Sequence, residues 1–150
     1  MKLYDLQQAI AKFLTEDEVL VKHNCKVLAE NKGDVLNEIQ SIVDRLGCAA
    51  LVLTPSFVAK GTNTKPPDGT ATIVVQVFES PPLNRGKANR ITALEAAERI
   101  AFILQCEWIK DANGNGIACP SLETIRLDSA QDILSCSVSF KVLTRLDGKI

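Results

Sequence analysis

Catalysis requires a nucleophile, a general base or a cluster of metal ligands, and this sequence offers few residues for these roles. Its only histidine, His23, is the one imidazole that could act as a general base near neutral pH. Cys25 follows closely in Lys22-His23-Asn24-Cys25, so a small enzyme using Cys25 and His23 is one hypothesis. The two side chains would need a sharp turn to meet, and we expect His23 to be a structural or surface residue.

The cysteines and glycines do not have the spacing of a metal, disulfide or phosphate site. The cysteines are odd in number and contain no Cys-x-x-Cys pair: Cys25, Cys48, Cys106, Cys119 and Cys136. Cys48, Cys106 and Cys136 lie in apolar runs and are expected to be small buried hydrophobes. Gly114-Asn115-Gly116 lacks the third glycine of a dinucleotide fingerprint. We therefore predict a protein that is not an enzyme and that uses no cofactor or metal ion.

The charges of the chain are balanced. Seventeen Lys and Arg residues against eighteen Asp and Glu residues give a formal net charge of −1. Such a chain has no global field that would attract a polyanion or an anionic membrane. Sequence-specific binding of nucleic acid and attachment to a membrane are therefore disfavoured. The acidic run Glu16-Asp17-Glu18 is typical of a solvated helix start or a turn.

Two local features could serve contacts with another protein. Arg85, Lys87 and Arg90 place three cations in a loop directly before an expected helix. They could contact an acidic neighbouring subunit, or they could remain solvated. Trp108, just past that helix, could anchor an interface or pack at the edge of the core. These residues are candidate positions of a subunit interface.

The helices that would position these residues follow from apolar spacing and from caps. Helical periodicity predicts three helices, over residues 3–14, 35–46 and 92–106. Gly47 ends the second helix, and the capping box Thr92-x-x-Glu95 begins the third. In the segment 15–32, a helix beginning at Thr15-x-x-Glu18 competes with a strand near 25–30, and we favour the strand.

Strands and loops follow from apolar runs and from turn residues. Strands are expected over residues 48–54, 71–79, 121–128 and 133–144. The last one alternates apolar residues with Ser135, Ser137 and Ser139, so we expect one buried face and one polar face. Residues 60–70 consist of turn-forming and polar residues and predict a flexible loop, and residues 111–116 predict a tight turn.

This order of elements predicts a single α+β domain over residues 1–150. We expect a mixed or antiparallel sheet of four to five strands, with helices packed mainly on one face. The first residues, Met1 to Gln8, include an acid and two glutamines where a signal peptide needs an apolar run. No stretch approaches the ~18 apolar residues of a membrane span. We therefore expect a protein that is not exported.

A strand ending at Glu79 leads into a proline-rich turn ending in Asn84-Arg85-Gly86, then an alanine-rich helix, a glycine turn and two closing strands. In this succession, most of the chain resembles the tail terminator or tail completion proteins of long-tailed bacteriophages and prophages. The resemblance covers about residues 33–145 and rests on the succession of elements. The local sequence Glu79-Ser80-Pro81-x-x-Asn84-Arg85 is also similar to that of these proteins.

The resemblance implies a virion protein assembled in the cytoplasm of a bacterial host. Such a protein forms a hexameric ring that ends the tail tube and joins it to the head completion proteins. A ring of this kind needs two different complementary patches on each subunit. The candidate patches are the basic loop 85–90, the loop 60–70, and the polar face formed by Ser135, Ser137 and Ser139. The alternative is a monomeric α+β ligand-binding or adaptor domain.

Overall fold

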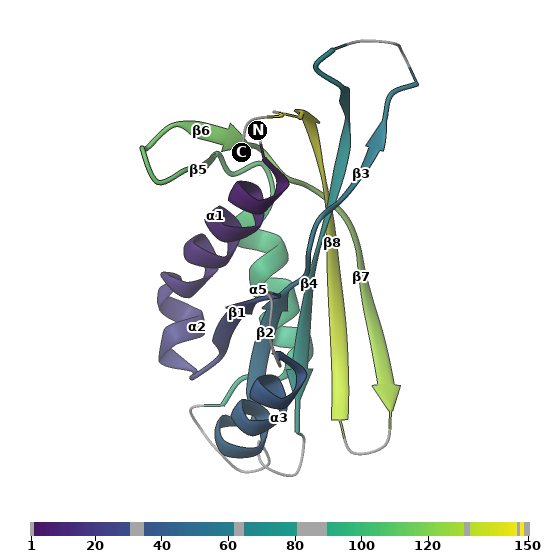
Figure 1. The fold of residues 1–150 in the computed structure, drawn as a ribbon. Helices are drawn as coiled ribbons and strands as arrows, with labels where there is room; N and C mark the ends of the chain where they lie inside the picture. The colour runs from purple at the N-terminus through teal and green to yellow at the C-terminus, as the bar shows by residue number, and fades with distance from the viewer. Residues whose placement is uncertain are drawn as a thin grey trace.

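A twisted sheet of six strands organises the molecule, as the computed structural model shows (Figure 1). The structure describes residues 2–30, 35–61, 65–80, 90–130, 133–146 and 148. The main path of the sheet runs through five strands, in the order β1 (Lys26–Ala29), β2 (Cys48–Val52), β4 (Asp68–Glu79), β8 (Ile133–Arg145) and β7 (Ser121–Ala130). β1 and β2 are parallel, and all other pairs are antiparallel. The predicted α+β class with a mixed or antiparallel sheet is confirmed.

The sixth strand, β3 (Ser56–Ala59), was not expected from the sequence. It pairs with the first part of β4, along the same edge that β2 occupies further on. The pairing along this edge continues to Leu53, whose N–H donates to the Val74 carbonyl at 2.9 Å. Pro55 interrupts it because proline has no backbone N–H to donate to the neighbouring strand. The sheet therefore has six strands, one more than the upper end of the predicted range of four to five.

Helices cover the two faces of the sheet unequally. Among the described residues, three helices pack on one face, namely α1 (Leu3–Thr15), α2 (Glu18–Lys22) and α5 (Ala93–Leu104). α3 (Val35–Leu46) packs on the other face, against β2. β2 is buried on both faces as a result: Cys48, Ala50 and Val52 join the main core, and Ala49 and Leu51 face α3. The expectation that helices pack mainly on one face is confirmed, with α3 as the exception.

The main core lies between α1, α5 and the centre of the sheet. Leu6, Ile10 and Leu14 of α1 are fully buried, as the apolar spacing predicted. The buried side of α5 consists largely of alanines, so its backbone can lie close to β4 and β8. β8 contributes alternate residues to this core, including Val138 and Phe140, while its serines lie on the other face.

Local sequence signals predicted several helix ends correctly. Gly47 follows α3 with a φ of 90°, a conformation that glycine adopts without steric cost. The Thr92 hydroxyl accepts the Glu95 N–H at 3.1 Å, and the Glu95 carboxylate accepts the Thr92 N–H at 3.2 Å. The expected turn at 111–116 joins the short strands β5 (Ile109–Lys110) and β6 (Gly116–Ala118).

The end of α5 and the start of β4 differ from the sequence expectation. α5 ends at Leu104, and Cys106 has a φ of 57° and is exposed, so the expectation of a buried Cys106 was wrong. The loop expected at 60–70 is shorter, because β4 begins at Asp68 and its carbonyl accepts the Lys60 N–H at 2.9 Å. Residues 62–64 of that loop lie outside the described residues.

Both alternatives for the segment 15–32 occur, one after the other. The short helix α2 is capped by Asp17, whose carboxylate accepts the Leu20 N–H at 3.1 Å, rather than by Thr15. The strand β1 then begins at Lys26, within the favoured interval. Among the helices in the described part of the chain, none has the length and apolar character needed to cross a membrane.

Candidate assembly surfaces

The cations expected at an interface are only partly within the described residues. Arg85 and Lys87 lie outside them. Arg90 is half-buried, and its guanidinium donates a hydrogen bond to the carbonyl of Leu46 at the end of α3. Cations are favourable at the C-terminus of a helix, so Arg90 contributes to the fold of its own chain. A contact between these cations and an acidic neighbouring subunit stays a prediction.

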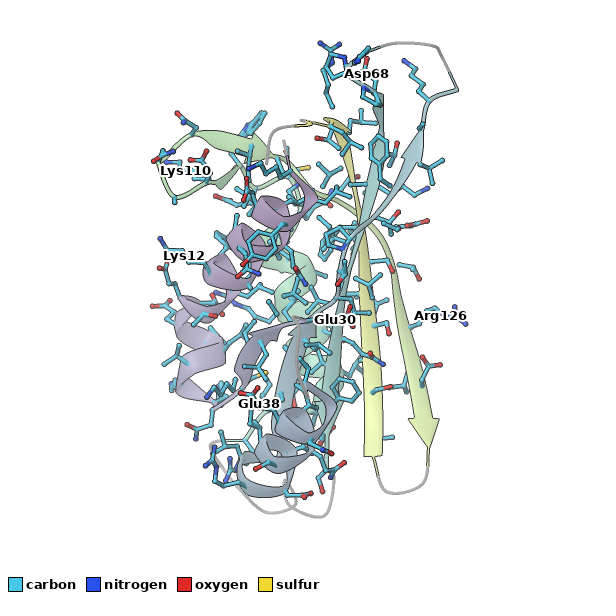
Figure 2. The ribbon with its side chains drawn as sticks, in the orientation of Figure 1. Lys12, Glu30, Glu38, Asp68, Lys110 and Arg126 are labelled. Atoms are coloured by element: carbon cyan, nitrogen blue, oxygen red, sulfur yellow. The ribbon has the colours of Figure 1, made fainter. Side chains whose placement is uncertain are left out.

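Ser135, Ser137 and Ser139 lie on the face of β8 that points away from α5. Each is half-buried between a residue of β4 and a residue of β7. We call this the outer sheet face, formed by the three serines and their cross-strand partners Val74, Gln76, Phe78, Thr124, Arg126 and Asp128. Phe78 contacts the cluster under α3, whereas Arg126 points away from the body of the molecule (Figure 2). The expected polar face is therefore present, at the centre of the sheet.

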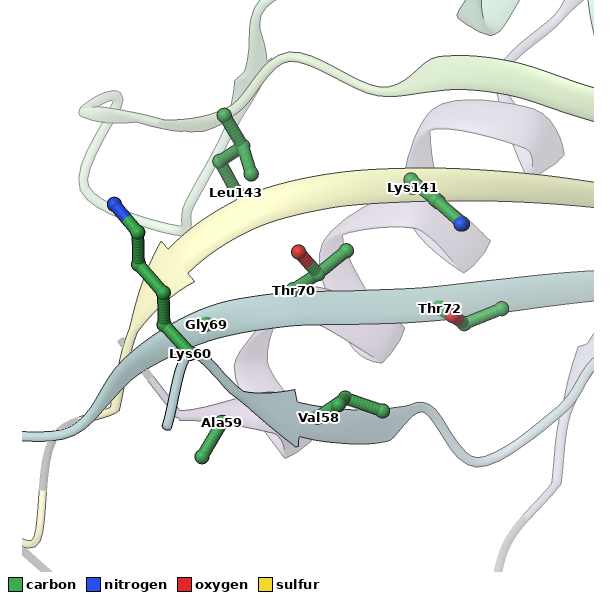
Figure 3. A pocket seen from close by; sticks show the side chains of 8 residues that line it. All are labelled: Val58, Ala59, Lys60, Gly69, Thr70, Thr72, Lys141 and Leu143. Carbon is green, nitrogen blue, oxygen red and sulfur yellow. The ribbon is translucent and has the colours of Figure 1, made fainter. Parts of the chain in front are cut away.

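A groove of about 370 Å³ lies at the end of the outer sheet face (Figure 3). Val58, Thr70 and Leu143 stand side by side across β3, β4 and β8, and Val58 and Leu143 are 68% and 87% exposed. Lys60 and Lys141 also line the groove, and the Lys141 ammonium lies 3.4 Å from the Glu123 carboxylate. The groove thus combines apolar side chains with cations.

Two features set the shape of this end of the sheet. Asp68 and Arg145 pair through two hydrogen bonds, of 2.7 and 3.1 Å. The bond from Arg145 lowers the pKa of the Asp68 carboxyl, against a smaller opposing effect of desolvation. At Gly69, a Cβ atom would lie only 2.2 Å from the Val58 carbonyl oxygen, so glycine is needed for β3 to approach β4 this closely.

A second exposed surface lies on the helix side of the sheet and was not predicted. α5 packs against β4, β8 and β7 but leaves the apolar residues of β7 partly open. Leu122, Ile125 and Leu127 pair with Phe140, Val138 and Cys136 and therefore share the face of the core. We define the β7–α5 surface as these three residues with Leu94 and Phe102 of α5. Phe102 is 76% exposed.

A hydrogen bond fastens α5 to the start of β7 beside this surface. The Leu122 N–H donates to the Gln105 side-chain oxygen at 2.6 Å. The sequence signal for the surface was weak, because Leu94 and Phe102 lie at helical spacing outside the alanine-rich side of α5. α5 lies against β7, and large apolar groups exposed on neighbouring elements are typical of protein interfaces.

Trp108 is 62% exposed at the start of the β5–β6 hairpin. Its indole lies over Gly116, where an added Cβ would come within 3.3 Å of the ring. The indole therefore packs in part within the hairpin, and a role of Trp108 as an interface anchor stays a prediction.

The two residues of the candidate catalytic pair lie on either side of the turn that follows α2. His23 is half-buried at the end of α2. Cys25 is buried, and its sulfur accepts a hydrogen bond from the Cys48 thiol across 3.5 Å. This hydrogen bond and burial raise the pKa of Cys48, so its thiol stays protonated at neutral pH. In the described part of the chain, no group of three or more His, Cys, Asp or Glu residues is arranged to hold a metal ion.

Solved structures share the architecture described above. One is a chain of the virion of a native gene transfer agent particle, with a TM-score of 0.67 and 14% sequence identity over 95% of this chain and 96% of that chain. This chain therefore has the fold of a virion component. A second structure, whose name describes no function, has a TM-score of 0.53 and 8% identity over 97% of this chain and 94% of that chain.

At these identities the likeness shows the fold alone. No protein-family model and no curated protein matches the sequence.

Proposed function

We propose that this chain is a structural protein of a phage-type virion, and within that class a subunit of the ring that terminates the tail. The observation that carries the proposal is the shared fold with a chain of the gene transfer agent virion, which extends over nearly the whole of both chains. The order of elements around Glu79 and α5 supports the finer assignment, because it resembles that of tail terminator proteins.

Two chemically different surfaces support assembly into a ring. A cyclic ring joins one patch of each subunit to a different patch of the next subunit. The β7–α5 surface is apolar, whereas the outer sheet face is mainly polar and ends in the groove beside Lys60 and Lys141. These surfaces lie on opposite faces of the sheet. A subunit with this arrangement can contact two neighbours at once without competition between the contacts.

The proposed partners are further copies of this chain, the tail tube and the head completion proteins. A hexamer is the ring size that the resemblance implies. Assembly would take place in the cytoplasm of the bacterial host, and the protein would remain in the virion. This role needs no catalytic residue, in accord with the protonated thiol of Cys48 and its contact with Cys25.

One observation favours a second function, that of a monomeric ligand-binding or adaptor domain. The groove beside Leu143 is concave and places Lys60 and Lys141 next to apolar side chains. Pockets of about this volume bind small ligands in many proteins. In a ring, the same groove would instead contact a neighbouring protein.

Native mass distinguishes the two functions. Light scattering over a wide range of protein concentration, with and without magnesium, should detect a closed species of about 98 kDa, six times the 16.3-kDa chain. Negative-stain images of that species should show rings. A monomer at every concentration, both alone and with tail tubes present, would favour the adaptor.

A further inference from the structure

Two cysteines far apart in sequence lie in direct contact where β1 joins the sheet. The sulfur atoms of Cys25 and Cys48 are 3.5 Å apart. β1 and β2 are parallel, and Lys26 pairs with Ala49, so the two cysteines stand side by side immediately before the paired residues. Their side chains are buried in the same core cluster. The backbone register therefore holds the two thiols together.

A cavity gives small molecules access to one member of this pair. It has a volume of about 260 Å³, and Cys25 lines it together with Asn24, Lys26 and Leu46. Asn24 has a φ of 58°, and the Cys25 N–H donates to the Leu20 carbonyl at 2.9 Å, so a tight turn places Cys25 at this cavity. Cys48 is almost wholly buried, with 1% of its surface exposed, and does not line the cavity.

We propose that Cys25 and Cys48 are an oxidation site, at which a small peroxide converts the two thiols into a disulfide. In the first step, the Cys25 thiolate attacks a peroxide oxygen, the O–O bond breaks, and hydroxide leaves. In the second step, the Cys48 sulfur attacks the sulfenic acid of Cys25, the S–O bond breaks, and water leaves with the Cys48 proton. Together the thiols lose two electrons, and hydrogen peroxide is reduced to water.

The order of the two steps follows from which cysteine lines the cavity. Cys25 meets the oxidant because it lines the cavity, and Cys48 resolves the sulfenic acid because its sulfur already touches that of Cys25. The bond would fasten β1, a strand of four residues at the edge of the sheet, to the buried strand β2. It would also close the chain segment that contains α3. This chemistry belongs to the single chain and does not depend on the proposed function.

The test is a peptide map of the full-length native protein after treatment with hydrogen peroxide and blocking of free thiols. Trypsin separates the two cysteines into peptides 23–26 and 46–60. We expect these peptides to be joined before reduction and separate after it, with three of the five thiols still free. The oxidised protein should also melt about 5–10 °C higher, because the bond restricts the unfolded chain.

Variants test which cysteine acts in each of the two steps. In the Cys48→Ala variant, the oxidation of Cys25 should stop at the sulfenic acid, which a dimedone probe labels. The matched control Cys136→Ala removes another buried cysteine and should still form the joined peptides. The wild-type map decides the proposal even if a variant fails to fold. Unlinked peptides 23–26 and 46–60 after peroxide treatment, or a bond from Cys25 to a different cysteine, would overturn it.

Discussion

The buried carboxylate of Glu79 accepts a hydrogen bond from the backbone N–H of Ala93 at 2.8 Å. This bond joins the last residue of β4 to the first residue of α5, although the two are fourteen positions apart. A negative charge is favourable at a helix N-terminus, where the first N–H groups have no partner within the helix. Glu79 therefore fixes how α5 is placed on the sheet, beside the capping box of Thr92 and Glu95.

Replacement of Glu79 should destabilise the fold. Glu79→Ala leaves the Ala93 N–H without this acceptor and should lower the free energy of unfolding by about 2 kcal/mol. Glu79→Gln keeps an acceptor oxygen and should cost about 1 kcal/mol. Urea unfolding measures both effects. The control Glu107→Ala, at an exposed position, should change stability by less than about 0.5 kcal/mol. A Glu79→Ala variant as stable as the wild type would show that the bond contributes nothing.

A paired charge links the N-terminal helices to α5. Arg99 donates two hydrogen bonds to the Asp17 carboxylate, of 2.7 and 3.2 Å, and Asp17 also caps α2. A double-mutant cycle with Asp17→Asn and Arg99→Met should give a coupling energy of about 1 kcal/mol. Additive effects of the two substitutions would contradict this link.

Acid should weaken the same pair. Burial by itself raises the pKa of Asp17, but the hydrogen bonds from Arg99 and from the backbone outweigh it and lower the pKa. The folded protein therefore binds this proton less readily than the unfolded chain does. The stabilisation that ionised Asp17 contributes is complete above pH ~4. It is lost as the pH falls through the lower pKa that Asp17 has in the folded protein. The stability difference between wild type and Asp17→Asn should shrink over this interval and stay constant near pH 7.

Alkaline solution should destabilise the protein through Cys48. The hydrogen bond to Cys25 and burial raise the pKa of its thiol, so the folded state keeps a proton that the unfolded chain loses. The stabilisation is complete below pH ~8.5 and declines as the pH rises above that value. Cys48→Ala should remove this part of the pH dependence. Val52→Ala, a buried change in the same strand without an ionisable group, should lower stability equally at every pH.

Cations placed on the β7–α5 surface should prevent assembly. Phe102→Lys and Leu127→Lys put charge at positions that are 76% and 59% exposed, so the monomer should remain folded. Association between subunits should weaken more than tenfold if these residues are buried in the ring. The matched control is Val21→Lys on α2, where the native side chain is 60% exposed away from this surface. Analytical ultracentrifugation compares the three variants, and equal association by all of them would exclude this surface.

The helices could be predicted from the sequence because their signals are local. The Thr92 capping box and Gly47 lie within one turn of the helix ends they determine, and the alternation around Ser137 extends over a long strand. β3 was missed because four residues are too few to show periodicity and its partner Thr70 lies in a segment rich in turn residues.

The candidate surfaces depended on tertiary relationships that local patterns do not contain. The apolar residues of β7 could be read from the sequence, but the extent to which α5 leaves them exposed could not. Asp17 belonged to an acidic run typical of solvated residues, yet it pairs with Arg99, 82 positions away. The contact between Cys25 and Cys48 likewise requires the parallel register of β1 and β2.

The most direct test of the tail-terminator proposal is electron microscopy of this protein added to polymerising tail tubes from the same genome. We expect a ring of subunits at one end of each tube and an arrest of further growth at that end. The Phe102→Lys variant should leave tube growth unaffected. Tubes that grow to the same lengths with and without the wild-type protein, with no density added at either end, would contradict the account.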